Sequence, residues 1–308
     1  MYDLVIIGGG PASAACAVYA ARKKLKAVLI TDEWGGQSTV SAGIENWIGT
    51  KNIPGFEFAK TLEEHVRAQN GIEIITGDKV LKVDGKNNGF TVSTESGTDY
   101  ESKTVFVGSG ASRRKLGVLG EKEYDGKGVA YCSTCDAPVF KDKAVAVVGG
   151  GNAGLEAAMD LVPYAKTIKL LEYSDKLKGD PATQDKVRES GKVEIIFNAE
   201  TLEIAGDKFV RELKYKDRAS GEGKKLDVEG VFIEIGSIPN SEMVKGLIET
   251  DKYGEIIVDH KNSRTSRLGI WAGGDVTDDP FKQNNISAGD GVKAALDIYN
   301  YLIIGDKR

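Results

Sequence analysis

The sequence predicts an α/β protein that contains two three-layer units of the same local plan. An apolar strand, a glycine-rich loop, a helical stretch and a second strand with an acidic end occur in this order twice, at 2–33 and 143–172. A third glycine-rich turn, at 273–275, follows a strand near the end of the chain. Short apolar strands that alternate with helices are typical of a parallel sheet covered by helices.

The first copy of the pattern is "YDLVIIGGGPASAACAVYAARKKLKAVLITDE", which ends at Asp32 and Glu33. Gly8 permits a tight turn after the first strand, and Gly10 lets the main chain approach a pyrophosphate at the positive end of the helix. Ser13 occupies the third position of this fingerprint, so the packing of helix on strand must accommodate a hydroxyl group. The expected strands are 4–7 and 27–30.

The second copy is "KAVAVVGGGNAGLEAAMDLVPYAKTIKLLEYSDKLKGD", with strands expected at 144–148 and 168–171. Gly149, Gly151 and Gly154 fill all three glycine positions, and Glu172 ends the second strand. A single match of this kind also occurs in unrelated glycine-rich turns. Two matches in full context predict two Rossmann-like dinucleotide-binding folds, most simply one for a flavin and one for a nicotinamide.

The last segment, "IWAGGDVTDDPFKQNNISAGDGVKAALDIYNYLI", predicts a strand at 268–272 and an amphipathic helix near 287–302. Asp275, in the glycine turn between them, can accept a hydrogen bond from a ribityl hydroxyl group. A capped helix after an ordinary turn explains the same pattern, so the segment alone leaves both interpretations open.

Composition limits the function classes. The chain has 308 residues, a length that is sufficient for two domains. Of these residues, 41% are hydrophobic and 28% are charged, which is typical of globular proteins. A net charge of −5 disfavours nucleic acid and anionic membranes as partners. No apolar run reaches the ~20 residues of a membrane span, and the N-terminus does not resemble a signal peptide. Three cysteines favour a reducing, cytoplasmic location.

Two of these cysteines, Cys132 and Cys135, lie in "YCSTCDAPVF". Structural zinc needs four ligands, and the other candidates are Cys16, in an alanine-rich helix where a small buried residue is expected, His65 and His260. A structural disulfide with so short a loop contributes only about 2 kcal/mol. Thiol–disulfide exchange needs a nucleophilic thiolate and a resolving partner, which a CxxC pair supplies. Electron relay is therefore the favoured role.

The whole chain resembles the low-molecular-weight thioredoxin reductases. It is also similar to the flavoprotein subunit of alkyl hydroperoxide reductase without the N-terminal thioredoxin-like domains of that subunit. The resemblance rests on nine motifs in family order, which are "GGGPASAA", "WGGQ", "IENWIG", "VGSGASRRK", "GVAYCSTCDAPVF", "VVGGGNAGLEAA", "IGSIPN", "AGGDV" and "KQNNISAGDG".

This resemblance implies a discontinuous FAD-binding domain, 1–111 with 242–308, and an inserted NAD(P)H-binding domain, 115–238, that carries the CxxC pair. It also implies contacts of particular residues with each dinucleotide. The FAD positions would be Gly8, Gly10, Pro11, Ala12, Asp32, Glu33, Gly36, Gln37, Asn46, Asp275, Lys282, Gln283 and Asn284. The nicotinamide-dinucleotide positions would be Gly149, Gly151, Asn152, Ala153, Gly154 and Glu172.

The resemblance also assigns catalytic roles. Cys135 would exchange electrons with the isoalloxazine, and Cys132 would attack the disulfide of a partner protein. Asp136 would be the general acid for the departing thiolate, which requires that burial raises its pKa; a helix-capping carboxylate is the alternative. We further expect the inserted domain to rotate about connectors near 110–120 and 236–240.

The choice of nicotinamide is expected to follow from "EYSDKLK", residues 172–178. Thioredoxin reductases that use NADPH carry a cluster of the form HRRxxxR at these positions, and this cluster binds the 2′-phosphate. Glu172 accepts hydrogen bonds from the ribose hydroxyls and repels a phosphate, and Lys178 cannot replace a bidentate guanidinium. We therefore expect NADH to be preferred over NADPH.

The sequence thus predicts a flavoprotein disulfide reductase that passes electrons from NADH to a thioredoxin-like or glutaredoxin-like protein. This carrier is expected to be a separate chain, for example one that feeds a peroxiredoxin, and the enzyme is expected to be a homodimer. Two alternatives remain, a ferredoxin-linked flavin thioredoxin reductase and a non-catalytic redox sensor whose CxxC pair switches an association. Both nucleotide loops are intact, which favours an enzyme over a sensor, and the "GGGNAG" loop favours an enzyme that uses a nicotinamide.

Overall fold

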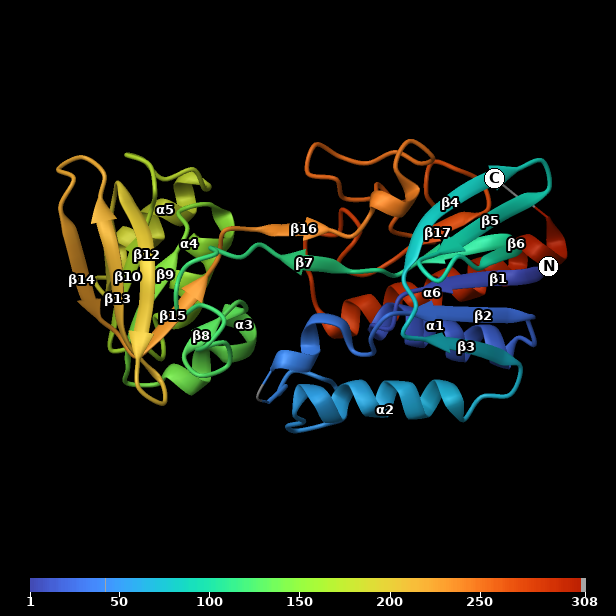
Figure 1. The fold of residues 1–308 in the computed structure, drawn as a ribbon, viewed down its shortest axis with the longest axis horizontal. Helices are drawn as coiled ribbons and strands as arrows, with labels where there is room; N and C mark the ends of the chain where they lie inside the picture. Colours follow the sequence, from blue (N-terminus) through green and yellow to red (C-terminus); the bar gives the residue numbers. More distant parts are fainter. Residues whose placement is uncertain (42, 306–308) are drawn as a thin grey trace. The chain divides into compact units, whose positions relative to one another are not determined.

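The chain forms two α/β units. The computed structural model describes residues 1–41 and 43–305. One unit contains Met1–Ser112 and Ile238–Arg308, and the other contains Arg113–Ser237. The chain crosses between them in β7 (Ala111–Arg113) and β16 (Ser237–Pro239), which pair as a two-stranded sheet (Figure 1). The predicted α/β class with parallel sheets is confirmed, whereas rotation about these connectors stays a prediction.

A seven-stranded sheet forms the centre of the first unit, in the order β3-β2-β1-β6-β5-β4 with β17 also paired to β6. β1 pairs in parallel with β2 and β6, and this register places Leu4 beside Ala27 and Thr104. Strands β4, β5 and β6 form an antiparallel meander. The strands are β1 (Tyr2–Ile7), β2 (Ala27–Thr31), β3 (Ile72–Thr76), β4 (Val80–Lys86), β5 (Gly89–Thr94), β6 (Asp99–Val107) and β17 (Ile270–Ala272).

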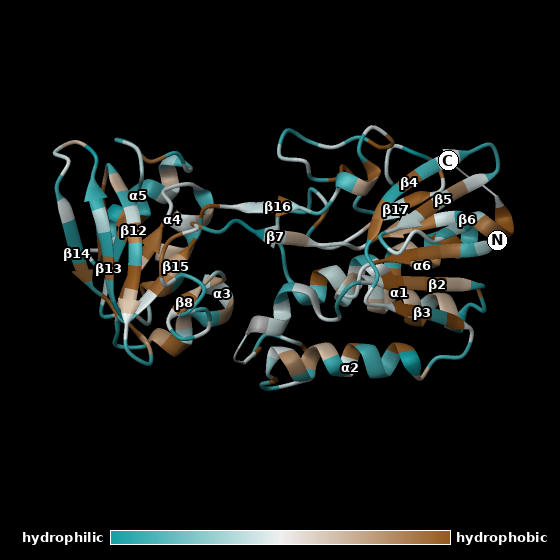
Figure 2. Cartoon of the chain, viewed as in Figure 1, coloured by the Kyte–Doolittle hydropathy of each residue, from teal (hydrophilic) through white to brown (hydrophobic). Residues whose placement is uncertain are grey.

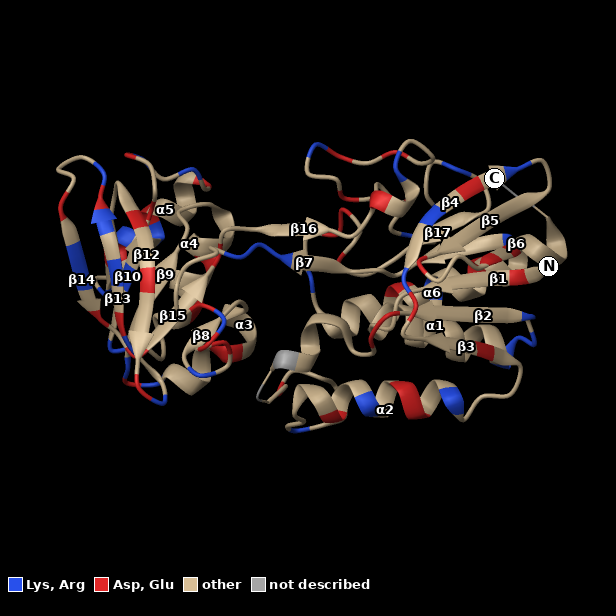
Figure 3. Cartoon of the chain, viewed as in Figure 1, with Lys and Arg blue, Asp and Glu red and all other residues tan. Residues whose placement is uncertain are grey.

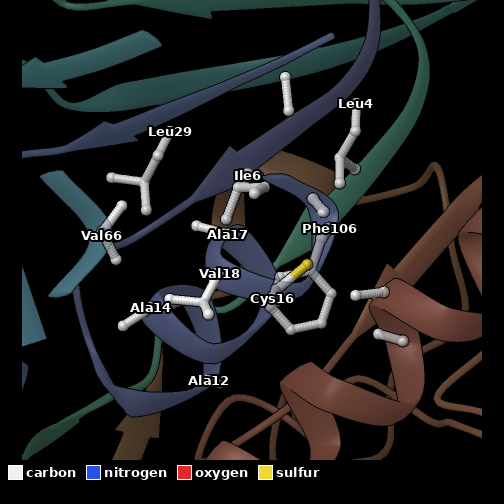
Figure 4. Close-up of a cluster of buried hydrophobic side chains, with 14 of the residues drawn as sticks. Leu4, Ile6, Ala12, Ala14, Cys16, Ala17, Val18, Leu29, Val66 and Phe106 are labelled. Carbon is white, nitrogen blue, oxygen red and sulfur yellow. The ribbon is translucent and has the colours of Figure 1, made fainter. Parts of the chain in front are cut away.

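Three helices cover one face of this sheet: α1 (Pro11–Arg22), α2 (Gly55–Arg67) and α6 (Asn284–Ile304). Figure 4 shows the core between α1 and the sheet, where Cys16 lies among Leu4, Ile6 and Phe106. Cys16 is fully buried, and burial raises the pKa of its thiol well above the ordinary value. Its expected role as a small packing residue is confirmed. Short 3₁₀ segments lie at η1 (Gly36–Val40) and η3 (Glu242–Val244).

The second unit is built on a parallel five-stranded sheet, in the order β11-β10-β9-β15-β8. Because successive side chains of a strand point to opposite faces, Val145 and Val147 of β9 pack toward the helices, while Ala146 and Val148 pack toward a second, antiparallel sheet. The parallel strands are β8 (Val129–Ala130), β9 (Ala144–Val148), β10 (Thr167–Leu171), β11 (Val193–Ile196) and β15 (Gly230–Ile233).

The helical layer of this unit consists of α4 (Asn152–Leu161), α5 (Pro181–Glu189), the single turn α3 (Ser133–Asp136) and η2 (Ala137–Phe140). The opposite layer is the antiparallel sheet of β12 (Ala199–Gly206), β13 (Val210–Asp217) and β14 (Gly223–Asp227). Lysines on β13 and β14 form cross-strand ion pairs, such as Lys225 with Glu212 at 2.8 Å, and Figure 3 shows this charge on the strands. This sheet was not predicted from the sequence.

Figure 2 shows the apolar residues concentrated in the central strands and on the helix faces that cover them. Among the described residues, no helix is both long and apolar enough to cross a membrane, α6 included.

Candidate active site

A disulfide joins Cys132 and Cys135 in the second unit. Cys132 has extended backbone angles and is the N-cap of α3, while Cys135 lies within that turn. The main-chain N–H of Asp136 closes the turn with a hydrogen bond of 3.0 Å to the carbonyl oxygen of Cys132. Both cysteines are partly buried, so the pair is neither sealed in the core nor fully exposed. A disulfide at the start of a helix can accept electrons and release a stabilised thiolate.

Asp136 follows the second cysteine directly. Burial raises the pKa of Asp136 to about 6, although the nearby Arg113 guanidinium acts in the opposite direction. A carboxyl group with this pKa is partly protonated near neutral pH and can therefore donate a proton. Asp136 thus has the burial that a general acid requires. Its side chain makes no helix-capping hydrogen bond at α3 or η2, so the alternative role as a helix cap has no support from these two elements.

Hydrogen bonds join the turn that carries the disulfide to α4. The hydroxyl groups of Ser133 and Thr134 donate to one carboxylate oxygen of Asp160 on α4, at 2.8 Å and 3.3 Å. The carboxyl group of Glu234, after β15, is buried, and burial raises its pKa to about 7 although the Arg113 guanidinium acts in the opposite direction. Asp160 and Glu234 were not predicted from the sequence, because both lie far along the chain from the CxxC motif.

The glycine loop between β9 and α4 lies in the same unit. A Cβ atom at Gly154 would be 1.8 Å from the carbonyl oxygen of Gly149, so only glycine allows this approach of helix to strand. At Gly151, the N-cap of α4, a Cβ atom would meet nothing within 4 Å. The Asn152 side chain accepts a hydrogen bond of 2.7 Å from the N–H of Asp180. The exposed Ala153 follows in the first turn. The helix start is thus open to a pyrophosphate.

Glu172, just after β10, points back to this loop. Its side chain is only 6% exposed and accepts hydrogen bonds from the N–H of Gly150 at 2.8 Å and from the N–H of Ser174 at 2.9 Å. The Ser174 hydroxyl group also donates to it, and Lys178 lies 3.9 Å away. Burial alone would raise its pKa, but these partners outweigh burial and hold the pKa of Glu172 below its usual value. The carboxylate is therefore ionised and fixed in orientation; Ser174 is an orienting residue that was not assigned from the sequence.

The glycine loop of the first unit has a similar construction. Gly10 is the N-cap of α1, with Pro11 at the first helical position and Ala12 next, and a Cβ atom at Gly10 would meet nothing within 4 Å. Ser13, at the third fingerprint position, donates hydrogen bonds to the carbonyl oxygens of Ile7 at 2.9 Å and Gly108 at 3.3 Å. The expected accommodation of this hydroxyl group is confirmed.

Other positions expected at the flavin lie in the same unit. Gly8 forms the turn after β1 with φ of +105°, and Asp32 and Glu33 are exposed at the end of β2. Gly36 and Gln37 are exposed at the start of η1.

Hydrogen bonds join η1 and the segment after it to the start of α6. The Asn46 side chain donates to Gln283 at 3.1 Å, and Ser38 donates to Asn284 at 2.9 Å. Asn285 donates to the carbonyl oxygen of Asn46 at 2.7 Å. Ser38 and Asn285 were not assigned from the sequence, although Asn285 lies within the "KQNNISAGDG" motif. These contacts bring together residues that are more than 230 positions apart in the chain.

Asp275 and Lys282 flank the loop between β17 and α6. The Ser287 hydroxyl group lies at 3.5 Å from a carboxylate oxygen of Asp275. Lys282 forms an ion pair with Glu255 at 2.9 Å and donates to the carbonyl oxygen of Thr277. These two contacts hold Lys282 against the loop, and its place at the flavin stays a prediction.

Within residues 1–41 and 43–305, no group of three or more His, Cys, Asp or Glu side chains could hold a metal ion. His65 is exposed on α2, and His260 lies near Asp278 and Asp279, at 3.4 Å and 3.7 Å.

The chain has relatives among known proteins. The profile of the pyridine nucleotide-disulphide oxidoreductase family matches residues 2–292. A protein of Staphylococcus aureus (strain MRSA252) that is named as a subunit of alkyl hydroperoxide reductase is 42% identical over 302 residues, which are 98% of this chain and 59% of that protein. The chain therefore spans about 59% of the length of these curated relatives.

Solved structures give the same result. Thioredoxin reductase from Streptococcus pyogenes MGAS5005 is 37% identical with a TM-score of 0.91, over 98% of both chains. Thioredoxin reductase from Giardia duodenalis is 30% identical with a TM-score of 0.92, also over 98% of both chains. The predicted resemblance and the two Rossmann-like units are confirmed.

Proposed function

Because the chain belongs to the pyridine nucleotide-disulphide oxidoreductase family, we propose that it is an NADH-dependent reductase of a dithiol carrier protein. Electrons pass from NADH by way of FAD to the Cys132–Cys135 disulfide and then to a thioredoxin-like or glutaredoxin-like protein. The disulfide beside a partly protonated Asp136 is the observation that carries this proposal.

FAD fits the first unit. The open main chain at Gly10 and the N-terminus of α1 suit a pyrophosphate, and the exposed Asp32 and Glu33 are acceptors for ribose hydroxyl groups. Asp275 is the proposed partner of the ribityl chain. The remaining positions, which would lie along the flavin or its phosphates, are Gly8, Pro11, Ala12, Gly36, Gln37, Asn46, Lys282, Gln283 and Asn284. When bound, FAD accepts a hydride from a nicotinamide and passes on an electron pair.

NADH fits the second unit better than NADPH. The loop from Gly149 to Gly154 offers an open helix start, and the ionised Glu172 lies at the end of the neighbouring strand. A fixed carboxylate accepts hydrogen bonds from ribose hydroxyl groups but repels a 2′-phosphate. The cation beside Glu172 is Lys178, at 3.9 Å, and an ammonium group does not offer the bidentate donors with which a guanidinium binds a phosphate.

The dithiol transfers electrons to the carrier by exchange. The Cys132 thiolate attacks the carrier disulfide, a mixed disulfide forms, and the first carrier thiolate leaves with a proton from Asp136. Cys135 then passes its proton to the Asp136 carboxylate and attacks the Cys132 sulfur, which re-forms the internal disulfide and releases the second carrier sulfur. That sulfur takes up the proton from Asp136. The carrier gains two electrons and two protons, and the enzyme loses the same number.

The carrier is proposed to be a separate protein that feeds a peroxiredoxin. The names of the relatives, a subunit of alkyl hydroperoxide reductase and several thioredoxin reductases, support this class of partner. A homodimer and a cytoplasmic location remain part of the proposal, and sedimentation of the holoenzyme tests the first.

Stopped-flow reduction of the yellow protein by NADH and NADPH in parallel tests the proposal. The flavin absorbance should fall faster with NADH than with NADPH, and a lower concentration of NADH should be needed to reach half of the maximal rate. Equal or reversed preference would overturn the role of Glu172. If neither nucleotide bleaches the flavin but reduced ferredoxin reduces the disulfide, the ferredoxin-linked alternative replaces the proposal.

A further inference from the structure

One carboxylate binds both residues that lie between the two cysteines. Oδ2 of Asp160 accepts a hydrogen bond of 2.8 Å from the Ser133 hydroxyl group and one of 3.3 Å from the Thr134 hydroxyl group. Ser133 and Thr134 are the middle residues of the motif whose ends, Cys132 and Cys135, form the disulfide. The carboxylate of Asp160 is therefore fixed beside the turn that contains the redox pair.

Both sides of this contact are anchored in one hydrophobic core. Asp160 is partly buried near the end of α4, and Leu155 and Leu161 of the same helix are fully buried. Ala137 and Phe140, which follow the CxxC turn, are buried in the same cluster as these two leucines. Because the helix and the turn cannot separate without opening this core, we expect the carboxylate to keep its place when the disulfide is reduced.

We propose that Asp160 is a positioning residue that makes the Cys132–Cys135 dithiol a stronger reductant. Its negative charge disfavours a thiolate in the neighbouring turn. It also occupies two hydroxyl hydrogens that would otherwise be free to stabilise a thiolate. Both effects destabilise the reduced form of the pair relative to the disulfide, and they therefore lower its reduction potential.

The step that Asp160 influences is the two-electron reduction of the disulfide. The S–S bond takes up an electron pair, breaks, and leaves two sulfur atoms that bind up to two protons. This inference rests on the proposed function, in which the electrons come from the pyridine nucleotide by way of FAD and pass to a carrier. Thioredoxin-like carriers have low reduction potentials, so a dithiol whose reduced form is destabilised reduces them more completely.

The equilibrium of the pair with dithiothreitol tests this inference. The FAD-loaded enzyme is held under argon at pH 8 with mixtures of reduced and oxidised dithiothreitol. The reductant gives two electrons and two protons to the disulfide and closes to its own cyclic disulfide. Thiols are then trapped by alkylation, and peptide mass spectrometry gives the reduced fraction at Cys132 and Cys135. At this pH Asp136, whose pKa is raised to about 6, is ionised in wild type and variants alike.

Asp160→Asn removes the charge and keeps an oxygen that can accept from the two hydroxyl groups. At pH 8 much of the more acidic thiol of a CxxC pair is ionised, so the loss of a neighbouring negative charge stabilises the reduced form. The equilibrium constant for reduction by dithiothreitol should therefore rise about fivefold.

Glu222→Gln is the matched control. Glu222 is exposed between β13 and β14, in the antiparallel layer on the opposite face of the parallel sheet from α3 and α4. Its loss of charge should leave the constant unchanged, and a rise equal to that in Asp160→Asn would overturn the inference.

The double substitution Ser133→Ala with Thr134→Val supplies a second test if Asp160→Asn does not fold. It removes both donors, so the carboxylate is no longer held beside the turn, and the constant should again rise. A constant within about twofold of wild type in Asp160→Asn, or in the double variant where only that one folds, would overturn the inference. NADH takes no part in this equilibrium, so the outcome is independent of the proposed function, which instead fails if NADH bleaches the flavin and no thiols appear.

Discussion

The N–H of Gly150 donates a hydrogen bond of 2.8 Å to the carboxylate of Glu172. This bond joins the glycine loop to the end of the adjacent strand, so the group proposed to select the ribose and the loop proposed to bind the pyrophosphate are held by one contact. Ser174 holds the other carboxylate oxygen through its N–H and hydroxyl groups. The proposed preference for NADH therefore depends on a carboxylate whose position is fixed before the dinucleotide binds.

Glu172→Gln should weaken the discrimination between the two nucleotides. The amide lacks the charge that repels a 2′-phosphate and accepts weaker hydrogen bonds from ribose hydroxyl groups, so KM for NADH should rise about tenfold while KM for NADPH falls. Steady-state kinetics with each nucleotide measure this. Glu194→Gln is the control, because Glu194 is exposed on β11, and its loss should leave both constants unchanged. Equal changes for both nucleotides would contradict the assignment.

Gly154→Ala should damage the second unit. The added methyl group would lie 1.8 Å from the Gly149 carbonyl oxygen, which forces α4 away from β9 and costs about 1–3 kcal/mol of unfolding free energy. Thermal unfolding followed by circular dichroism measures the loss, and the flavin absorbance should persist. Gly151→Ala is the comparison, because its methyl group meets no protein atom within 4 Å. Gly151→Ala should unfold at the wild-type temperature and raise KM for NADH. A larger loss of stability in Gly151→Ala than in Gly154→Ala would contradict the close approach of α4 to β9 at Gly154.

Cys135→Ser should separate the two halves of the reaction. The flavin should still be reduced by NADH at the wild-type rate, whereas reduction of a dithiol carrier should be abolished, because no internal disulfide can form. Cys16→Ala is the control; Cys16 is buried in the other unit, so carrier turnover should remain. Loss of flavin reduction in Cys135→Ser would show that the proposed order of electron flow is wrong.

Asp136→Asn should change the pH dependence of carrier reduction. The pKa of Asp136 is raised to about 6, so its proton-donating form predominates below pH 6 and is lost as the pH rises above it. The wild-type rate of the exchange step should therefore decline from about pH 6 to about pH 8. The variant should be slower by about 10²-fold at pH 6 and show a flatter profile. A variant profile that parallels that of wild type would assign the decline to another group.

The elements proposed to bind dinucleotides could be predicted from the sequence, because each consists of a strand, a glycine loop and a helix that follow one another directly in the chain. The strand at 144–148 agrees with β9 residue for residue, and both glycine loops lie between a strand and a helix as expected. Burial of Cys16 followed from the small residues around it. The last helix begins at Asn284, earlier than the predicted 287, because polar residues of its first turn contact η1 and the following segment instead of solvent.

The rest depends on contacts between distant parts of the chain. Asp160 reaches the CxxC turn from α4, and no spacing in the sequence relates it to Cys132. The sheet β12-β13-β14 alternates charged and apolar residues with two shifts of register, which weaken the period-two signal. Asn46 and Gln283 were each expected near the flavin only through the family resemblance, and their mutual hydrogen bond was not predicted.

The central claim, that electrons reach the sulfur atoms of Cys132 and Cys135, is tested most directly by counting thiols after anaerobic addition of NADH to the FAD-loaded enzyme. The account predicts that two thiols appear beyond the buried Cys16 and that mass spectrometry locates them at positions 132 and 135. Bleaching of the flavin without new thiols at these two positions would contradict it.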